Sequence, residues 1–437
     1  MQTVDLIVHA SWIIPVNQAR DVLADHALVV DQGKVVATLP SKEANLAYQA
    51  KEELDLAGRA LIPGLINTHG HAAMTLFRGM ADDLPLMTWL NDHIWPAEGK
   101  WVSSEFVHDG TQIAIAEMLR SGTTTYSDNY FFPEDAIRAI LPTKMRAQLN
   151  FAVLDFPNNW ASGPDDALAK GTELVKSYRE HDQVRVIYGP HAPYTVSDEP
   201  LLKIKALAEE HGVGIQMHVH ETQGEVDDAV KANGERPVAR LHRLGLLGPH
   251  FQAVHMTALN DDDIRMCAET GTHIIHNPES NLKLASGFCP VDALQKSGVN
   301  VALGTDGAAS NNDLDMLGEM RTAAQLAKAV AMNAEALPAY EALAVATING
   351  AKAMNRHHEL GSLEAGKLAD FAAIDLSDIE SAPIYDPVSH IVYATSRQQV
   401  EHVWIGGEQV VKHRELLTID RQEMIAKAST WRSKIKE

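Results

Sequence analysis

The sequence has few cysteines and no long apolar run, and both deficits exclude whole classes of protein. Its 437 residues include two cysteines, Cys267 and Cys289, and neither belongs to a Cys-x-x-Cys pair. A disulfide framework and a thiolate zinc site are therefore unsupported, and we expect a reducing, cytoplasmic compartment. No stretch approaches 18 uninterrupted apolar residues, which predicts no membrane span. No basic segment followed by an apolar one marks a signal peptide at the start.

Positive charge is also scarce. The chain carries 37 lysines and arginines against 58 aspartates and glutamates, a formal net charge of −21. Such a surface repels nucleic-acid phosphates and anionic membranes, so we expect neither as a partner. Apolar residues make up 45% of the chain, which is ordinary for a globular protein and allows a large core.

The middle of the chain alternates short apolar runs with helix-compatible stretches. Eight runs are predicted as strands, at residues 61–67, 123–128, 145–155, 184–189, 214–220, 252–255, 272–276 and 299–305. Strands that alternate with helices imply parallel pairing, and eight units predict a closed (β/α)8 TIM-like barrel. The fold class is therefore α/β.

Both ends of the chain are rich in β-like runs instead. They lie at residues 6–10, 27–30 and 34–38, and at residues 370–374, 390–393, 403–405 and 408–411. We expect the two ends to pair into one small composite β-sandwich domain. The predicted domains are residues 1–58 plus 365–437 for this sandwich, and residues 59–364 for the barrel. Two separate terminal lobes are the alternative.

Polar residues follow many of the barrel strands. His69 and His71 come after the first strand, and alternate residues of an extended chain face the same side, so two imidazoles converge. His218 and His220 share a face in the same way at the end of the fifth strand, and spacing does not decide between them. Asp306 follows the eighth strand. The carboxyl ends of barrel strands meet at one face, where we expect the active site.

These residue types predict a metal centre. Two histidines of the first strand, one of the fifth and Asp306 form the kind of set that holds a catalytic zinc together with a water molecule. We expect one divalent ion, with zinc first and iron or manganese as alternatives. The fourth strand leads to His191 and offers no lysine, so a second metal bridged by a modified lysine is unsupported. The ordinary alternatives are a turn aspartate at 306 and buried neutral histidines elsewhere.

Two motifs resemble the amidohydrolase superfamily. Residues 63–71 (PGLINTHGH) are similar to its first-strand signature, and residues 361–370 (GSLEAGKLAD) to its return into the terminal domain. A closer resemblance is to 5′-methylthioadenosine/S-adenosylhomocysteine deaminases. It is carried by residues 74–79 (MTLFRG), 95–98 (WPAE), 189–194 (GPHAPY), 218–222 (HVHET) and 303–316.

The resemblance implies a role for each residue of the centre. It implies a metal ligand set of His69, His71, His218 and Asp306, and so favours His218 over His220. It implies that Glu221 carries a proton to the purine ring, while His255 and Asp306 orient the attacking water. Glu221 and Asp306 would both touch the substrate.

The resemblance also implies the substrate contacts. His191 would contact the adenine, and Glu98 would accept hydrogen bonds from the ribose hydroxyls, which a carboxylate can do in pairs. Trp95 belongs to the expected pocket wall. Related enzymes often place an arginine after the third strand, but residues 155–163 contain none, so we expect Asn159 or the neighbouring tryptophan to line the pocket instead.

The expected reaction is hydrolytic deamination at C6 of adenosine thioethers, giving the inosine analogue and ammonia. The substrate would be a small nucleoside such as 5′-methylthioadenosine or S-adenosylhomocysteine, and the sequence does not rank the 5′ substituents. The alternatives are a guanine deaminase, an s-triazine hydrolase or a non-catalytic metal-binding protein. A homo-oligomer is expected.

Overall fold

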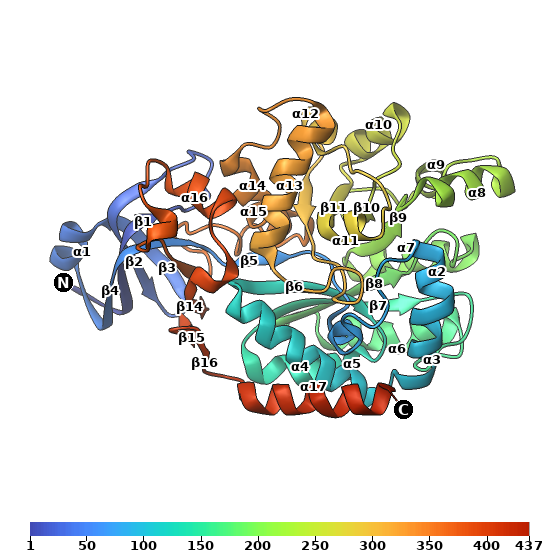
Figure 1. The fold of residues 1–437 in the computed structure, drawn as a ribbon, viewed down its shortest axis with the longest axis horizontal. Coiled ribbons are helices and arrows are strands. Elements are labelled where there is room, and N and C mark those ends of the chain that lie inside the picture. Colours follow the sequence, from blue (N-terminus) through green and yellow to red (C-terminus); the bar gives the residue numbers. More distant parts are fainter. Residues whose placement is uncertain (437) are drawn as a thin grey trace.

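The structure is a computed structural model that describes residues 1–436, and it contains two eight-stranded sheets (Figure 1). One sheet combines strands from both ends of the chain, in the order β16-β15-β14-β13-β4-β1-β2-β3. Its members are β1 (Gln2–Ile13), β2 (Leu23–Asp31), β3 (Lys34–Pro40), β4 (Tyr48–Pro63), β13 (Phe371–Asp375), β14 (Val400–Ile405), β15 (Glu408–Lys412) and β16 (Glu415–Leu416). The expected pairing of the two termini is confirmed.

Strand β4 joins the two halves of this terminal sheet, because it pairs in parallel with β1 and antiparallel with β13. Apolar side chains from both ends share one core, in which Leu28 and Val8 belong to the same cluster as Trp404. Phe371 stacks on Trp404 with ring centroids 4.5 Å apart. Helix α1 (Ser41–Ala47) packs against the opposite face of β1 and β2. The two ends of the chain thus form one continuous eight-stranded sheet with a shared core, and not two separate lobes.

The second sheet is the barrel, and its eight parallel strands follow chain order. Backbone hydrogen bonds from the Thr68 amide to the Leu303 carbonyl (2.9 Å) and from the Asp306 amide to the His69 carbonyl (3.0 Å) join the first segment to the last. The ring is thereby closed, and the predicted barrel is confirmed. Its strands are β5 (Leu65–Asn67), β6 (Thr123–Tyr130), β7 (Arg146–Val153), β8 (Val184–Pro190), β9 (Ile215–Val219), β10 (Phe251–His255), β11 (His273–His276) and β12 (Val301–Leu303).

The first predicted strand, residues 61–67, is divided between the two sheets. Residues up to Pro63 pair with β13, and Leu65 begins β5. Gly64 lies at the transition, where a Cβ atom would come within 2.1 Å of the Thr124 hydroxyl oxygen. The chain can pass from one sheet to the other here because glycine leaves this space free.

Helices surround the barrel. They are α4 (Ser104–Arg120), α5 (Pro133–Ile140), α6 (Pro164–Ser177), α7 (Asp198–His211), α8 (Gln223–Asn233), α9 (Pro237–Arg243), α10 (Asp261–Thr270), α11 (Pro278–Lys283), α12 (Val291–Lys296), α13 (Met316–Ala331), α14 (Ala339–Val345) and α15 (Ile348–Ala353). Short helices after β5 build a cover over the carboxyl ends of the strands. The cover consists of η1 (Ala72–Phe77), α2 (Leu86–Thr88), the π-helix η2 (Trp89–Ile94) and α3 (Trp95–Trp101).

The strand predicted at residues 390–393 is wrong, because these residues belong to helix α16 (Pro387–Tyr393). The Asp386 side chain accepts a hydrogen bond from the Val388 amide, and Pro387 occupies the first turn. Both features favour the start of a helix. Val388, Ile391 and Val392 are buried, which is the i, i+3, i+4 spacing of one helix face.

A C-terminal helix, α17 (Arg421–Lys436), lies against α4 of the barrel (Figure 1). Its buried Trp431 packs edge-on against Phe106 and donates a hydrogen bond to Asp109.

The domain bounds stay a proposal, with residues 1–58 plus 365–437 as the terminal domain and residues 59–364 as the barrel. Two elements cross these bounds, because α17 contacts the barrel and β4 extends to Pro63. None of the helices in residues 1–436 has the length and apolarity needed to cross a membrane.

Candidate active site

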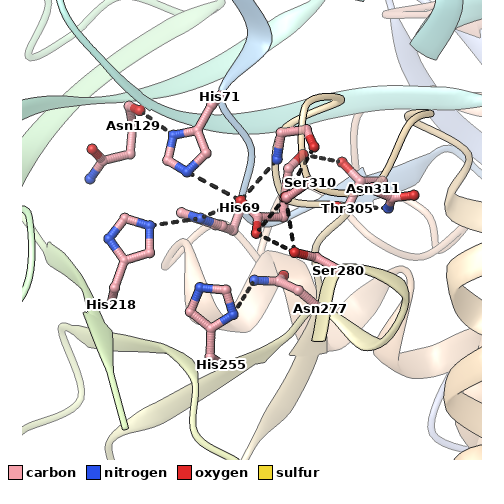
Figure 2. A network of polar contacts seen from close by, with 12 residues as sticks. His69, His71, Asn129, His218, His255, Asn277, Ser280, Thr305, Ser310 and Asn311 are labelled. Atoms are coloured by element: carbon pink, nitrogen blue, oxygen red, sulfur yellow. Dashed lines mark hydrogen bonds and ion pairs between the residues drawn. The ribbon is translucent and has the colours of Figure 1, made fainter. Parts of the chain in front are cut away.

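Side chains from the carboxyl ends of four barrel strands converge on one point (Figure 2). The Nε2 atoms of His69 and His218 lie 3.2 Å apart, and the Nε2 atom of His71 lies 3.1 Å from the Asp306 carboxylate. Two nitrogen ligands that share a tetrahedral zinc ion at about 2.0–2.1 Å would have a comparable separation. The structure therefore brings together the four residues that the resemblance implied as ligands.

The opposite nitrogen of each ring has a partner that sets its tautomer. His69 Nδ1 bonds the Gln216 amide oxygen at 2.8 Å, His71 Nδ1 the Asn129 carbonyl at 2.6 Å, and His218 Nδ1 the His191 carbonyl at 2.7 Å. Oxygens of this kind only accept, so the proton lies on Nδ1 and the Nε2 lone pair faces the centre. Lone pairs this close repel each other without a cation between them. The donor set therefore fits a divalent metal ion.

The electrostatics favour a neutral imidazole at two of the three histidines, whereas the hydrogen bond and charge of Asp306 outweigh burial and raise the pKa of His71 to about 9. Burial, together with the neighbouring histidines, holds the pKa of His218 well below its ordinary value. Burial likewise lowers the pKa of His69, against the opposing effect of Asp306. Neutral imidazole is the form that binds metal, so His69 and His218 are available as ligands at neutral pH.

Asp306 is held by its own set of contacts. Its Oδ2 atom accepts hydrogen bonds from the Ser280 hydroxyl at 2.7 Å and the Ser310 hydroxyl at 3.1 Å. Its Oδ1 atom accepts one from the Gly307 amide. The backbone at Asp306 has a φ of 61°, and His255 has a φ of 73°. Left-handed backbone is costly for such residues and gathers at functional sites, and here it turns both side chains toward the centre.

His220 faces away from the cluster. Its Nε2 atom accepts a hydrogen bond from the Val238 amide, and its Nδ1 atom lies 3.8 Å from Asp263, in the layer between the barrel and its helices. Spacing alone left His218 and His220 equivalent. The turn after β9 separates them, because the φ of 52° at His220 ends the regular alternation of the strand.

Glu221 and His255 lie beside the cluster. Their side chains approach to 3.7 Å, between Oε2 and Nε2, and His255 Nδ1 bonds the Asn281 amide oxygen at 2.9 Å. Burial, reinforced by the charge of Asp306, raises the pKa of Glu221 to about 8. The Glu221 carboxyl is therefore protonated at neutral pH, as a proton donor requires.

A cavity opens directly above these groups, between the strand ends and the cover. Trp95 and Glu98 of α3 line it, as do His191 and Asn159. Trp160 does not, because it is buried with its indole nitrogen bonded to Glu134. All the residues implied as substrate contacts therefore share one cavity.

Three of these wall residues have distinctive surroundings. Burial raises the pKa of Glu98 to about 7, against the lowering effect of the nearby Tyr130 hydroxyl. Burial lowers the pKa of His191 to about 3, so this ring is neutral, and its Nδ1 atom bonds the Thr195 hydroxyl. The amide nitrogen of Asn159 donates to the carbonyls of Glu98 and Val102, which braces the last turn of α3.

The sequence did not predict the residues that hold the site's histidines and Asp306 in place. These residues are Gln216, Asn129, Asn281 and Ser280. Each contacts a site residue that is far away in the chain, so no local spacing indicates it. One signal was available, since Gln216 lies two residues before His218 and therefore on the same face of β9.

Comparison with known proteins agrees with the geometry. The amidohydrolase family model matches residues 60–410. The chain belongs to the amidohydrolase family. A 5-methylthioadenosine/S-adenosylhomocysteine deaminase of Saccharophagus degradans is 52% identical over 431 residues, 99% of this chain and 97% of that relative.

Solved structures extend the comparison. An adenosine deaminase from Xanthomonas campestris with bound zinc superimposes with a TM-score of 0.98 at 46% identity, over 100% of this chain and 99% of that one. An atrazine chlorohydrolase from Arthrobacter aurescens, complexed with zinc, reaches 0.91 at 21% identity over 98% and 99% of the two chains, and shares the fold alone. Family, geometry and donor set together support a divalent metal centre.

Proposed function

We propose that this amidohydrolase deaminates adenosine thioethers at C6, converting 5′-methylthioadenosine or S-adenosylhomocysteine to the inosine analogue and ammonia. The observation that carries the proposal is the position of Glu221, which lies beside the His/Asp cluster and lines the same cavity as Glu98. Burial raises the pKa of Glu221 to about 8, which favours the protonated form. The full-length likeness to a deaminase of these substrates supports the same reaction.

We propose zinc as the metal and His69, His71, His218 and Asp306 as its ligands. When bound, the ion lowers the pKa of a water molecule so that a nucleophile is available at neutral pH. The three inward Nε2 atoms and the Asp306 carboxylate support this assignment. The zinc held by the similar Xanthomonas campestris structure supports the identity of the ion.

Glu221 and His255 supply the proton chemistry in this proposal. Glu221 gives its proton to ring N1, which draws electron density from C6 and makes that carbon electrophilic. His255, held by Asn281, and Asp306 orient the attacking water and take up its proton. C6 then carries both the new hydroxyl and the amino group. The proton taken from the water passes to the amino nitrogen, the C6–N bond breaks to release ammonia, and the hydroxyl proton returns to Glu221 as the C6 carbonyl forms.

The cavity wall provides the proposed substrate contacts. Glu98 accepts hydrogen bonds from the two ribose hydroxyls, and the neutral ring of His191 contacts the adenine. Trp95 offers an apolar surface to the 5′ side. Asn159 bounds this side and keeps the turn that bears Glu98 in place through its bonds to backbone carbonyls.

The main test is ammonia release from 5′-methylthioadenosine, S-adenosylhomocysteine, guanine and a triazine, before and after treatment with a zinc chelator. We expect the enzyme to release ammonia from 5′-methylthioadenosine and S-adenosylhomocysteine but not from guanine or the triazine. The activity should be lost on chelation and should return when zinc is added. Turnover of guanine or the triazine, without turnover of either adenosine, would refute the proposal. Complete inactivity of a metal-loaded protein would favour a non-catalytic role.

A variant sharpens the assignment of substrate. Glu98→Gln removes the charge that accepts two hydroxyls, so turnover of the nucleosides should fall far more than turnover of free adenine. Equal losses on both would show that Glu98 does not bind ribose.

The homo-oligomeric state stays a prediction, and light scattering of the purified protein tests it.

A further inference from the structure

A second cavity lies on the outside of the barrel and shares no lining residue with the active-site cavity. It is a groove of about 380 Å³ between α4, the β15–β16 turn and α17. Four arginines line it, Arg120, Arg397, Arg414 and Arg421, whereas Glu117 is its only carboxylate. Such a concentration of positive charge is unexpected in a chain with a net charge of −21. We call it the arginine groove.

Three of the four arginines have no carboxylate within ion-pair distance in residues 1–436: Arg120, Arg414 and Arg421. The fourth, Arg397, pairs with Glu117 at 3.1 Å and with Asp313 at 3.4 Å. Glu117 is further engaged by Arg78, so it does not neutralise the groove. The other three guanidinium groups form no ion pair within residues 1–436, and Glu415 acts on Arg414 only from beyond ion-pair distance.

Two of these arginines are held in place by the backbone. Arg414 Nη1 donates to the carbonyls of Arg397 (2.6 Å) and Val400 (3.2 Å), and Arg120 Nε donates to the Arg414 carbonyl (3.2 Å). In residues 1–436 the remaining nitrogens of both guanidinium groups have no hydrogen-bond partner. These contacts also bring Arg120 and Arg397 next to Arg414. Burial and the charges of Arg120 and Arg397 lower the pKa of Arg414, against the opposing charge of Glu415.

An anion would relieve the repulsion between these like charges. Guanidinium groups present paired N–H donors that match phosphate oxygens, and a phosphate has more charge and more acceptors than a carboxylate. The groove is also lined by apolar side chains, among them Ile113, Met424 and Ile425. A phosphate joined to a small apolar group would use both kinds of side chain.

We propose that the arginine groove is a binding site for a small phosphate monoester. Arg120, Arg414 and Arg421 bind the phosphate, and the α4 and α17 side chains cover the organic part. The groove shares no residue with the catalytic cavity. The net charge of −21 on the whole chain disfavours an anionic membrane as the source of the phosphate.

Calorimetric titration of the zinc-loaded enzyme tests the proposal, with inorganic phosphate and phenyl phosphate as probes. We expect both to bind, phenyl phosphate more tightly, and the affinity to fall as sodium chloride is raised. Arg421→Gln and Arg120→Gln should each weaken binding about tenfold, as for loss of one charge-assisted contact. Both variants should retain deaminase turnover, since neither residue touches the catalytic cavity.

Arg265→Gln is the matched control, because Arg265 is an exposed arginine on α10 that pairs with Asp262. It should bind both probes like the parent enzyme. Equal affinity in all variants would place the anion elsewhere and overturn the proposal, as would absence of binding by the parent. Binding to phosphatidylglycerol vesicles without binding of phenyl phosphate would overturn it in favour of a membrane contact.

Discussion

At the scale of single residues, the site depends on which atom of each side chain is free. His69 and His218 offer Nε2 because their Nδ1 atoms donate to fixed oxygens. Glu221 retains its proton because its carboxyl is buried close to another negative charge. A histidine with other partners has another role. The Nε2 atom of His220 accepts a hydrogen bond from the Val238 amide, so it is not free to bind a metal ion.

Replacing Glu221 tests the proton donor. Glu221→Gln keeps the size of the side chain but removes the acidic proton, and positioned acid–base groups contribute about 10²–10⁴-fold. We expect kcat for 5′-methylthioadenosine to fall within that range while the zinc content, measured by atomic emission, stays at the parent level. A variant with full activity would exclude Glu221 as the donor.

The raised pKa of Glu221 also predicts a pH profile. The carboxyl donates only in its protonated form, which dominates below about pH 8 and is lost above it. We therefore expect kcat/KM to fall tenfold for each unit above about pH 8. It should also fall below about pH 7, because Glu98, whose pKa is raised to about 7, must be ionised to accept both ribose hydroxyls. A decline in kcat/KM with rising pH that starts near pH 4.5 would show that Glu221 has the pKa of an ordinary carboxyl, and it would contradict the assignment of Glu221 as the proton donor.

At the scale of elements, the strand ends and the junction between the sheets place the site. His69 and His71 follow β5, which starts directly after Gly64 at the transition from the terminal sheet. A local shift at this transition would move both histidines, because β5 is only three residues long.

Gly64→Ala should therefore destabilise the protein. The added Cβ atom would meet the Thr124 side chain at 2.1 Å, and overpacking of this kind typically costs about 1–3 kcal/mol. Urea unfolding measures the loss. Gly248→Ala is the control, since nothing lies within 4 Å of its Cβ position. Equal stability of the two variants would show that the junction can relax without cost.

At the scale of the whole molecule, the two sheets are connected by a buried ion pair. Arg146 of β7 binds Asp370 through two nitrogens, at 2.7 and 3.2 Å, and both side chains are more than 90% buried. Asp370 also accepts a hydrogen bond from the Gly406 amide in the β14–β15 turn. The barrel and the terminal sheet therefore stabilise each other at this contact.

Asp370→Ala should leave Arg146 charged and unpaired in the interior. Breaking a buried pair in this way costs about 3–5 kcal/mol. Removing a carboxylate from an exposed pair, as in Asp262→Ala beside Arg265, should cost about 0–1 kcal/mol. Thermal unfolding of both variants gives the comparison, and similar melting temperatures would mean that the contact contributes little.

Much of the architecture could be predicted from local sequence. The barrel strands were predictable because each is an apolar run between helices, and the centre was predictable because polar residues end those runs. The prediction failed at residues 390–393, where an apolar run without a decisive period was read as a strand. Pro387 and the Asp386 cap make it a helix.

The sequence by itself determined the fold class, the metal-binding residue types and the strand ends that carry them, since all of these follow from patterns within a few residues. Only the tertiary structure shows His218 turned toward the cluster and His220 turned away from it. It alone places Gln216 behind His69 and Asn281 behind His255, and brings the arginine groove together from α4, α17 and the β15–β16 turn. The physical reason is that tautomers, pKa values and uncompensated charges depend on neighbours in space, and closure of the barrel brings together residues that are distant along the chain.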